Sequence, residues 1–129
     1  MAFLVEMDVG FLRLKLHGTV SSADLFGMLG ALNRLERELP QVPHRLIDLT
    51  EIMSSEVKAE EIREIAARRQ ASHYKNGFRS AIAAVKPAQL GYARMFQILN
   101  EHPEIEIQIF PTPDEAVVWL RAAKAQAAV

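Results

Sequence analysis

The sequence predicts an α/β domain in which four helices flank a mixed five-stranded sheet. Two observations predict it. Apolar and polar residues alternate with period two near the start, and short apolar strands then alternate with amphipathic helices. A hairpin followed by strand–helix alternation adds parallel strands, with right-handed connections, to an antiparallel pair. We expect one domain over 1–129, because a chain of 129 residues is long enough to bury one core.

Residues 3–7 and 11–17 are predicted to form the hairpin, with Gly10 supplying the backbone freedom that its turn needs. The second strand alternates between leucines and polar side chains, in the order Leu12, Arg13, Leu14, Lys15, Leu16, His17. One face of this pair is therefore expected to meet the core and the other to meet water.

Ser21 and Ser22 predict the start of the first helix, because a serine hydroxyl accepts hydrogen bonds from free backbone N–H groups. Gly27 and Gly30 weaken this helix. They indicate either close packing on a neighbouring element or a backbone surface on which a ligand or partner lies. Phe26 falls outside the apolar stripe, so Phe26 and Gly30 are candidate ligand-binding residues. The stripe itself comprises Leu25, Met28, Leu29, Leu32 and Leu35.

A short buried strand is predicted over residues 44–49, and a helix over residues 56–74 that Ser54 or Ser55 caps. The apolar stripe of this second helix is narrow, so we expect it to be the least protected element. The stripe comprises Ile62, Ile65 and Ala66.

A basic group lies at the far end of the second predicted helix and beyond it, comprising Arg63, Arg68, Arg69, His73, Lys75 and Arg79. A charge run of this kind is usually a solvated face. The alternative is an anionic partner, with weak contact between a membrane surface and Arg68, Arg69 and Lys75.

The last third of the chain predicts strand, helix, strand and helix. A small apolar strand covers residues 80–85, Pro87 begins a helix, and residues 104–110 alternate as an edge strand. Thr112 and Glu115 form a capping box around Pro113 at the start of the final helix. The residues expected to face inward from these two helices are Tyr92, Met95, Phe96, Leu99, Ala116, Trp119, Leu120 and Ala123.

Composition excludes several classes of function. The formal net charge is −1, which gives no bulk attraction for nucleic acid. The chain has no cysteine, so it has neither disulfides nor thiol chemistry, as is typical of a reducing compartment. No apolar run approaches the roughly 20 residues that span a bilayer, and the start lacks the features of a signal peptide. We therefore expect a cytoplasmic protein.

No catalytic or metal-binding motif is present. The four histidines fall on separate predicted elements, and the chain has neither a glycine-rich phosphate loop nor a nucleophile elbow. We therefore expect no catalytic residue, no metal and no cofactor.

Two charged residues, Asp48 and Arg94, could still take part in ligand chemistry. Asp48 ends a predicted strand, where it could act as a base, bind a ligand or accept hydrogen bonds from its own loop. Arg94 could bind a carboxylate or phosphate, pair with Asp48 or Glu51, or cover core aromatics. Together with Tyr92 on the same helix, these residues complete the candidate ligand-binding set.

The order of elements, with particular residues in them, resembles the STAS/SpoIIAA-like family. The resemblance spans nearly the whole chain and is most specific in Arg45-Leu46-Ile47-Asp48-Leu49-Thr50, in Gly91-Tyr92-Ala93-Arg94-Met95-Phe96, and in Phe110, Asp114-Glu115-Ala116 and Trp119-Leu120. Anti-sigma-factor antagonists and CRAL-TRIO lipid-binding domains share this fold in outline. The resemblance implies a SpoIIAA-like (STAS-like) mixed five-stranded sheet with four flanking helices.

The resemblance also implies a serine that could be phosphorylated. Regulatory members of the family carry one in an Asp-Ser-Ser-Gly context at a helix start, and this chain has Met53-Ser54-Ser55-Glu56 at about that position. Ser54 and Ser55 are the candidates, although the Asp and the Gly are missing and Glu56 adds like charge. Helix capping is the alternative role.

The resemblance and the missing motifs predict a non-catalytic STAS-like binding or regulatory module that acts through protein or small-ligand interaction, with a homodimer as one arrangement. The alternative is a carrier of a small apolar ligand or lipid with weak membrane-surface association, using a cleft between the first two helices and the sheet. An enzyme using Asp48 and Arg94 ranks third. A cavity between helices and sheet would favour the carrier over the first class.

Overall fold

The computed structural model describes residues 3–71, 73–99 and 102–123. The elements follow in the order β1 (Phe3–Asp8), β2 (Phe11–Val20), α1 (Ser22–Glu38), β3 (Arg45–Ser55), α2 (Ala59–Gln70), β4 (Phe78–Ala83), α3 (Pro87–Leu99), β5 (Ile105–Phe110) and α4 (Pro113–Arg121). The five strands form one sheet in the order β1-β2-β3-β4-β5. β1 is antiparallel to β2, and the remaining neighbours are parallel. The predicted α/β class, the mixed sheet and the order of elements are confirmed.

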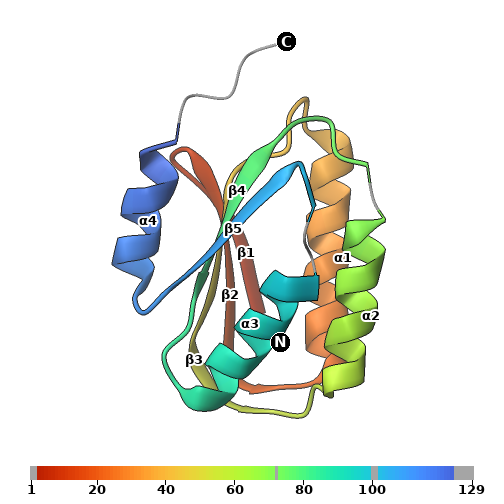
Figure 1. Ribbon diagram of the computed structural model, residues 1–129, viewed down its shortest axis with the longest axis vertical. Helices are drawn as coiled ribbons and strands as arrows, with labels where there is room; N and C mark the ends of the chain where they lie inside the picture. Colours follow the sequence, from red (N-terminus) through yellow and green to blue (C-terminus); the bar gives the residue numbers. More distant parts are fainter. Residues whose placement is uncertain (1–2, 72, 100–101, 124–129) are drawn as a thin grey trace.

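The sheet separates two unequal layers of helices. Helices α1, α2 and α3 cover one face, and α4 covers part of the other (Figure 1). The three-helix face buries long aliphatic side chains such as Leu14, Met28 and Ile65. The α4 face instead buries Phe11, Leu46, Ala81, Ala83, Ala116 and Leu120.

The hairpin follows the predicted alternation. Leu12, Leu14 and Leu16 are buried on the three-helix face. On the opposite face Lys15 pairs with Glu51 of the neighbouring strand β3. Gly10 has a φ of 86°, the left-handed conformation that the turn needs.

Helix α1 begins as predicted. The Ser21 hydroxyl accepts a hydrogen bond from the Asp24 N–H at 3.1 Å, and the Asp24 carboxylate accepts one from the Ser21 N–H at 3.0 Å. Gly27 lies against the ring of Phe3, because a Cβ at Gly27 would be 3.1 Å from that ring. Close packing therefore explains Gly27. A Cβ at Gly30 would meet nothing within 4 Å, so packing does not explain this glycine.

The predictions for β3 and α2 were wrong at their shared boundary. β3 continues past Leu49 to Ser55, and neither Ser54 nor Ser55 caps a helix. The strand extends because β2 also continues, and its last residues Thr19 and Val20 pair with the two serines. Helix α2 starts only after Lys58, whose N–H donates to the Glu61 carboxylate at 3.0 Å.

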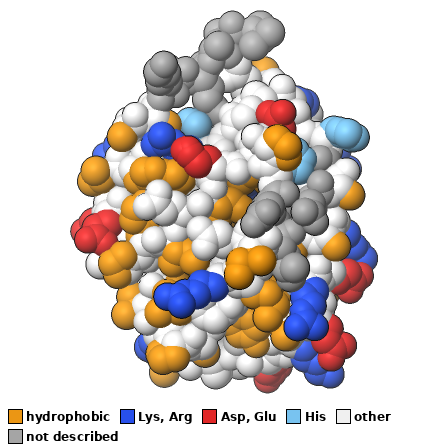
Figure 2. Space-filling model, in the orientation of Figure 1, with side chains coloured by type: hydrophobic (Ala, Val, Ile, Leu, Met, Phe, Trp, Pro, Cys, Tyr) orange, Lys and Arg blue, Asp and Glu red, His pale blue; other side chains and the backbone are white. Residues whose placement is uncertain are grey.

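The basic group around the end of α2 is for the most part exposed, as predicted, and Arg69 is the exception. Arg69 is only 7 % exposed, and its guanidinium donates to Glu36 on α1 at 2.8 Å. The Lys75 ammonium donates to the carbonyl oxygen of Leu39 at 2.8 Å, just beyond α1. Arg68 is exposed and pairs with Glu64 of its own helix. Of the three charges proposed for a membrane surface, Arg69 is therefore buried and Lys75 is exposed but bonded to backbone carbonyl oxygens. On the face in Figure 2, basic and acidic side chains lie side by side along the lower right edge, and others lie singly among hydrophobic ones.

A buried ion cluster fills the three-helix face near the start of β3. Glu36 accepts from Arg45 at 3.1 Å as well as from Arg69, and the Arg45 guanidinium lies 4.3 Å from the ring centre of Phe78. Arg45 is only 3 % exposed. Burial and the neighbouring Arg69 lower the pKa of Arg45 to about 9. We call these residues the Arg45–Glu36–Arg69 cluster.

The C-terminal elements follow the predicted types and order, but β4 runs from Phe78 to Ala83 rather than over 80–85, and α4 ends at Arg121, before Ala123. Thr112 caps α4 by accepting from the Glu115 N–H at 3.2 Å, and Ala116 and Leu120 are buried. Trp119 was expected inside but is only half-buried, because its ring lies at the margin of α4 between Phe110 and the Arg79 guanidinium. The side chains of Phe96 and Leu99, also predicted to face inward, lie outside the described residues.

Candidate functional site: an apolar cavity at the carboxyl edge of the sheet

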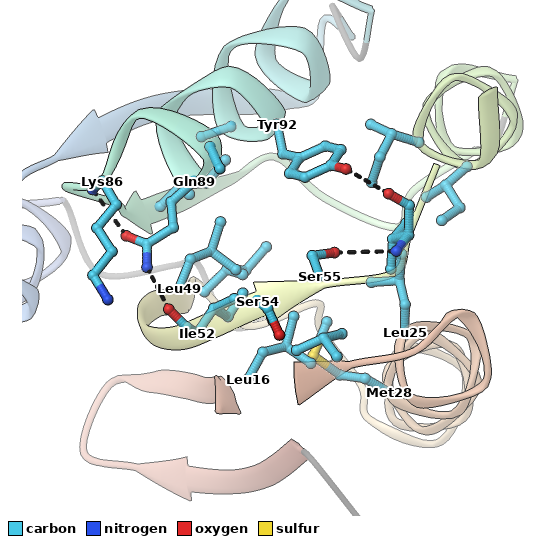
Figure 3. Close-up of a pocket in the computed structure, with 18 of the residues that line it drawn as sticks. Leu16, Leu25, Met28, Leu49, Ile52, Ser54, Ser55, Lys86, Gln89 and Tyr92 are labelled. Atoms are coloured by element: carbon cyan, nitrogen blue, oxygen red, sulfur yellow. Dashed lines mark hydrogen bonds between the residues drawn. The ribbon is translucent and has the colours of Figure 1, made fainter. Parts of the chain in front are cut away.

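A cavity of about 140 Å³ lies between the sheet and helices α1, α2 and α3 (Figure 3). It is placed where the parallel strands β2, β3 and β4 end and the helices begin, the edge at which open α/β sheets usually bind ligands. Most of its wall is aliphatic and comes from six elements. Examples are Leu16 of β2, Leu29 of α1, Ile52 of β3, Ile62 of α2, Ile82 of β4 and Ala93 of α3.

The cavity opens to solvent between the end of β3 and the start of α3. Met53, Lys86 and Ala88 line it and are themselves exposed, Met53 to 81 %. Val85 beside them is 54 % exposed. We call these four residues the rim.

Gln89 holds the rim together. Its side chain is only 4 % exposed, and its Oε1 accepts from the N–H groups of Val85 at 3.2 Å and Lys86 at 3.1 Å. Its Nε2 donates to the carbonyl oxygen of Ile52 at 3.0 Å (Figure 3). One side chain thus caps the start of α3 and ties it to β3.

A second set of hydrogen bonds closes the opposite end of the cavity. The Tyr92 hydroxyl donates to the carbonyl oxygen of Val57 (Figure 3). The N–H of Val57 in turn donates to the Ser55 hydroxyl at 3.1 Å. These bonds fix the segment between β3 and α2 against α3. The cavity therefore has one bonded end and one open end.

Lys86 is the only ionised group among the described lining residues, which include no Asp or Glu. Within the described parts of the chain, no carboxylate lies within ion-pair distance of its ammonium. The other polar lining groups, Gln89, Tyr92, Ser54 and Ser55, all have hydrogen-bond partners.

The predicted ligand-binding residues do not gather into one site. Tyr92 lines the cavity, whereas Phe26 and Gly30 are exposed on α1 and outside its lining. Arg94 is exposed on α3 and also lies outside the lining. Of the two pairings proposed for Arg94, Glu51 instead pairs with Lys15.

Asp48 accepts hydrogen bonds from a near neighbour, as one of its three predicted roles required, but both residues lie within β3 and not in a loop. Its Oδ1 accepts from the N–H and the hydroxyl of Thr50, at 2.9 and 2.6 Å. It is 4 % exposed and shares its face of β3 with Leu46, which packs under α4. Asp48 therefore faces away from the cavity.

The candidate phosphorylation residues lie at the end of β3 rather than at a helix start. Ser54 is exposed, and its Oγ lies 2.9 Å from the Thr19 hydroxyl. Ser55 is half-buried at the cavity wall. Their surroundings therefore differ from each other, although they are adjacent in sequence.

Sequence reasoning missed Gln89, Lys86 and Met53. A signal for Gln89 was present. It is the third residue of a helix that begins at Pro87, and a glutamine at that position is one half of a capping box. Nothing in the pattern pointed to Met53, since β3 was expected to end before it.

The described residues include no cluster of three or more His, Cys, Asp or Glu suited to a metal ion. A search of the same residues finds no helix with the length and apolar character to cross a membrane.

Comparison with known proteins gives structural neighbours only. No protein-family model matches the chain, and no curated protein matches it. An uncharacterised DUF3478-family protein with a SpoIIAA-like fold from Shewanella loihica PV-4 has a TM-score of 0.60 and 21% identity over 92% of both chains. An anti-sigma factor antagonist from Mycobacterium paratuberculosis has a TM-score of 0.61 and 18% identity, also over 92% of both.

A third similar structure is the anti-sigma factor antagonist SpoIIAA in its unphosphorylated form, with a TM-score of 0.60 and 14% identity over 95% of this chain and 100% of that one. At these identities the likeness defines the fold. The chain has a SpoIIAA-like fold, as its sequence predicted.

Proposed function

We propose that the protein is a non-catalytic binding module of the regulatory SpoIIAA-like type, with its ligand site in the cavity at the carboxyl edge. The cavity carries the ligand site, and its small size, together with the anti-sigma factor antagonists among the similar structures, favours this class over the carrier that a cavity alone would indicate. An apolar cavity of about 150 Å³ inside a protein stays dry and takes up benzene, and this one, at about 140 Å³, is nearly that size. Its open rim provides a path for a ligand.

A regulatory role is supported by two features. Two of the similar structures are anti-sigma factor antagonists, a class named for action on another protein. In this chain the exposed side chains of Met53 and Val85 lie at the rim, beside the backbone groups that Gln89 ties together. A ligand in the cavity would thus change the position of exposed rim residues that a protein partner could contact.

The arrangement of charged residues supports a role without catalysis. Asp48 is bound to Thr50 on the α4 face, whereas Arg94 is exposed on α3 across the sheet. An acid–base site needs such groups within hydrogen-bond reach of one substrate. We propose Ser54, whose hydroxyl is exposed, rather than half-buried Ser55, as the residue open to phosphorylation.

Benzene binding tests the ligand site. A ligand that binds only the folded state raises the melting temperature as its concentration rises. We expect benzene to raise the Tm of the wild type, and Ala93→Leu to abolish this shift because the larger side chain fills the cavity. Ala67→Leu, the same change at an exposed position of α2, should keep it.

A second blocking variant makes the test independent of core repacking. Ala88→Trp changes an exposed rim residue, so it should fold and obstruct entry. The proposal fails if benzene shifts no Tm, or shifts the Tm of all four proteins equally.

The alternative function is a carrier of an apolar ligand or lipid with weak membrane-surface association. The cavity favours it, but a space of benzene size accepts only a short segment of an acyl chain. Arg69 and Lys75 are also engaged within the fold. Cosedimentation with anionic vesicles at low salt, lost at high salt, would support the carrier. No association at either salt would contradict its membrane step.

A further inference from the structure

We propose that the cavity binds a small monocarboxylate, whose apolar body fills the cavity while its carboxylate pairs with the Lys86 ammonium at the rim. This inference rests on the proposed ligand site and names the chemical class of the ligand.

The charge of the site selects an anion. Lys86 is an exposed residue of the cavity lining, and no carboxylate in the described parts of the chain pairs with its ammonium. A lysine just before a helix is electrostatically unfavourable, because the helix start already carries partial positive charge. The described first turn of α3 holds no acidic residue, in contrast to the first turns of α1, α2 and α4. An anion at the rim would offset both positive charges.

The shape of the site selects a short body. Its volume corresponds to about six carbon atoms, by comparison with cavities that hold benzene. At the far end the Tyr92–Val57 and Ser55–Val57 hydrogen bonds hold the segment after β3 against α3, so a longer body would have to break them to extend past it. The ligand must therefore carry its polar group at the open end.

The geometry at the rim fixes the orientation of the ligand. Lys86 and Gln89 lie at one end of the lining, and Ser55 and the Tyr92 hydroxyl lie toward the other (Figure 3). Both polar atoms of the Gln89 amide are already used: Oε1 accepts from the start of α3, and Nε2 donates to Ile52. The flexible Lys86 ammonium remains as the group that can move onto a carboxylate.

Benzoate and benzamide provide a matched pair of probes, because they share one ring and differ in charge. Isothermal titration calorimetry should show that the wild type prefers benzoate by about fivefold, the upper range for a partly exposed ion pair. Lys86→Gln should remove this preference and leave benzamide binding unchanged. Arg34→Gln, which removes an exposed positive charge on α1 outside the lining, should retain it.

Two further measurements test the ion pair and the size limit separately. The preference should shrink in high salt, because ions screen an exposed pair. 1-Naphthoate, with a second ring, should bind more weakly than benzoate. Equal wild-type affinities for benzoate and benzamide, or a preference that survives in Lys86→Gln, would overturn the inference. In that event benzene binding would still support the ligand site, whereas failure of benzene, benzamide and benzoate together would remove both proposals.

Discussion

The two faces of the sheet are packed in different ways. On the α4 face, Ala81, Ala83 and Ala116 are fully buried, so one helix lies close against the strands. On the three-helix face, long side chains from α1, α2 and α3 meet those of the strands. There the amino edge is filled by the Arg45–Glu36–Arg69 cluster, and the carboxyl edge retains the cavity.

This difference indicates why the candidate site lies where it does. Small residues at each contact can fill the space between a sheet and a single helix. Where three helices pack on one face, the side chains of all three must fit against the sheet and one another, and gaps are then left more readily. Pockets lined by aliphatic groups with a few convergent polar groups are the usual ligand sites. The three-helix face, which retains the cavity, is therefore the face on which we propose the ligand site.

The largest expected effect is at the polar end of the three-helix face. Glu36→Leu leaves two buried guanidinium groups without their shared carboxylate, so we expect a loss of about 3–5 kcal/mol in the free energy of unfolding. Chemical denaturation measures it. Glu38→Leu, at an exposed position of the same helix, should change stability by no more than about 0.5 kcal/mol. Similar losses in both variants would show that the cluster contributes little.

Enlarging one alanine on each face compares the two faces directly. Ala83→Leu overfills the α4 face and should cost about 1–3 kcal/mol, whereas Ala93→Leu grows into the cavity and should cost less than about 1 kcal/mol. Denaturation of the two variants in parallel gives the difference. If Ala93→Leu proves the more costly, the space beside α3 is not available to a ligand.

A smaller effect is expected at the start of α4, the nine-residue helix that packs on the α4 face of the sheet. Thr112→Ala removes the side-chain oxygen that accepts from the Glu115 N–H, and should cost about 1 kcal/mol. Thr112→Ser keeps the oxygen and should stay near the wild type. An alanine variant as stable as the serine variant would mean that the cap is dispensable.

The smallest expected effect depends on pH and concerns His44. Burial and the nearby Arg79 lower the pKa of His44 below its usual value of 6.5. As the pH falls, His44 is therefore protonated first in the unfolded chain. Its contribution to the free energy of unfolding is complete above about pH 6.5 and is lost as the pH falls from there toward the lowered pKa of the folded protein. We therefore expect a small loss of stability between pH 7 and pH 5.

His44→Gln should reduce this pH dependence, and His17→Gln, at an exposed position, should not. Denaturation curves at several pH values measure the slope. A slope unchanged in His44→Gln would assign the pH dependence to other groups.

The sequence by itself determined the features that depend on near neighbours in the chain. Alternation in 11–17 predicted a strand with one buried face, and Ser21 and Thr112 predicted two helix starts. These patterns are reliable because a cap or an alternating strand is set by residues within one turn or one strand. The same patterns, in order, predicted the fold.

Only the tertiary structure decided the features that join distant residues. β3 runs on to Ser55 because the end of β2 lies beside it, and Arg69 is buried because Glu36 on another helix accepts its charge. The cavity likewise depends on how six elements fit around one volume, which no local pattern encodes. Pairing and packing between segments far apart in sequence set these features, so the candidate site emerged only once the chain was folded.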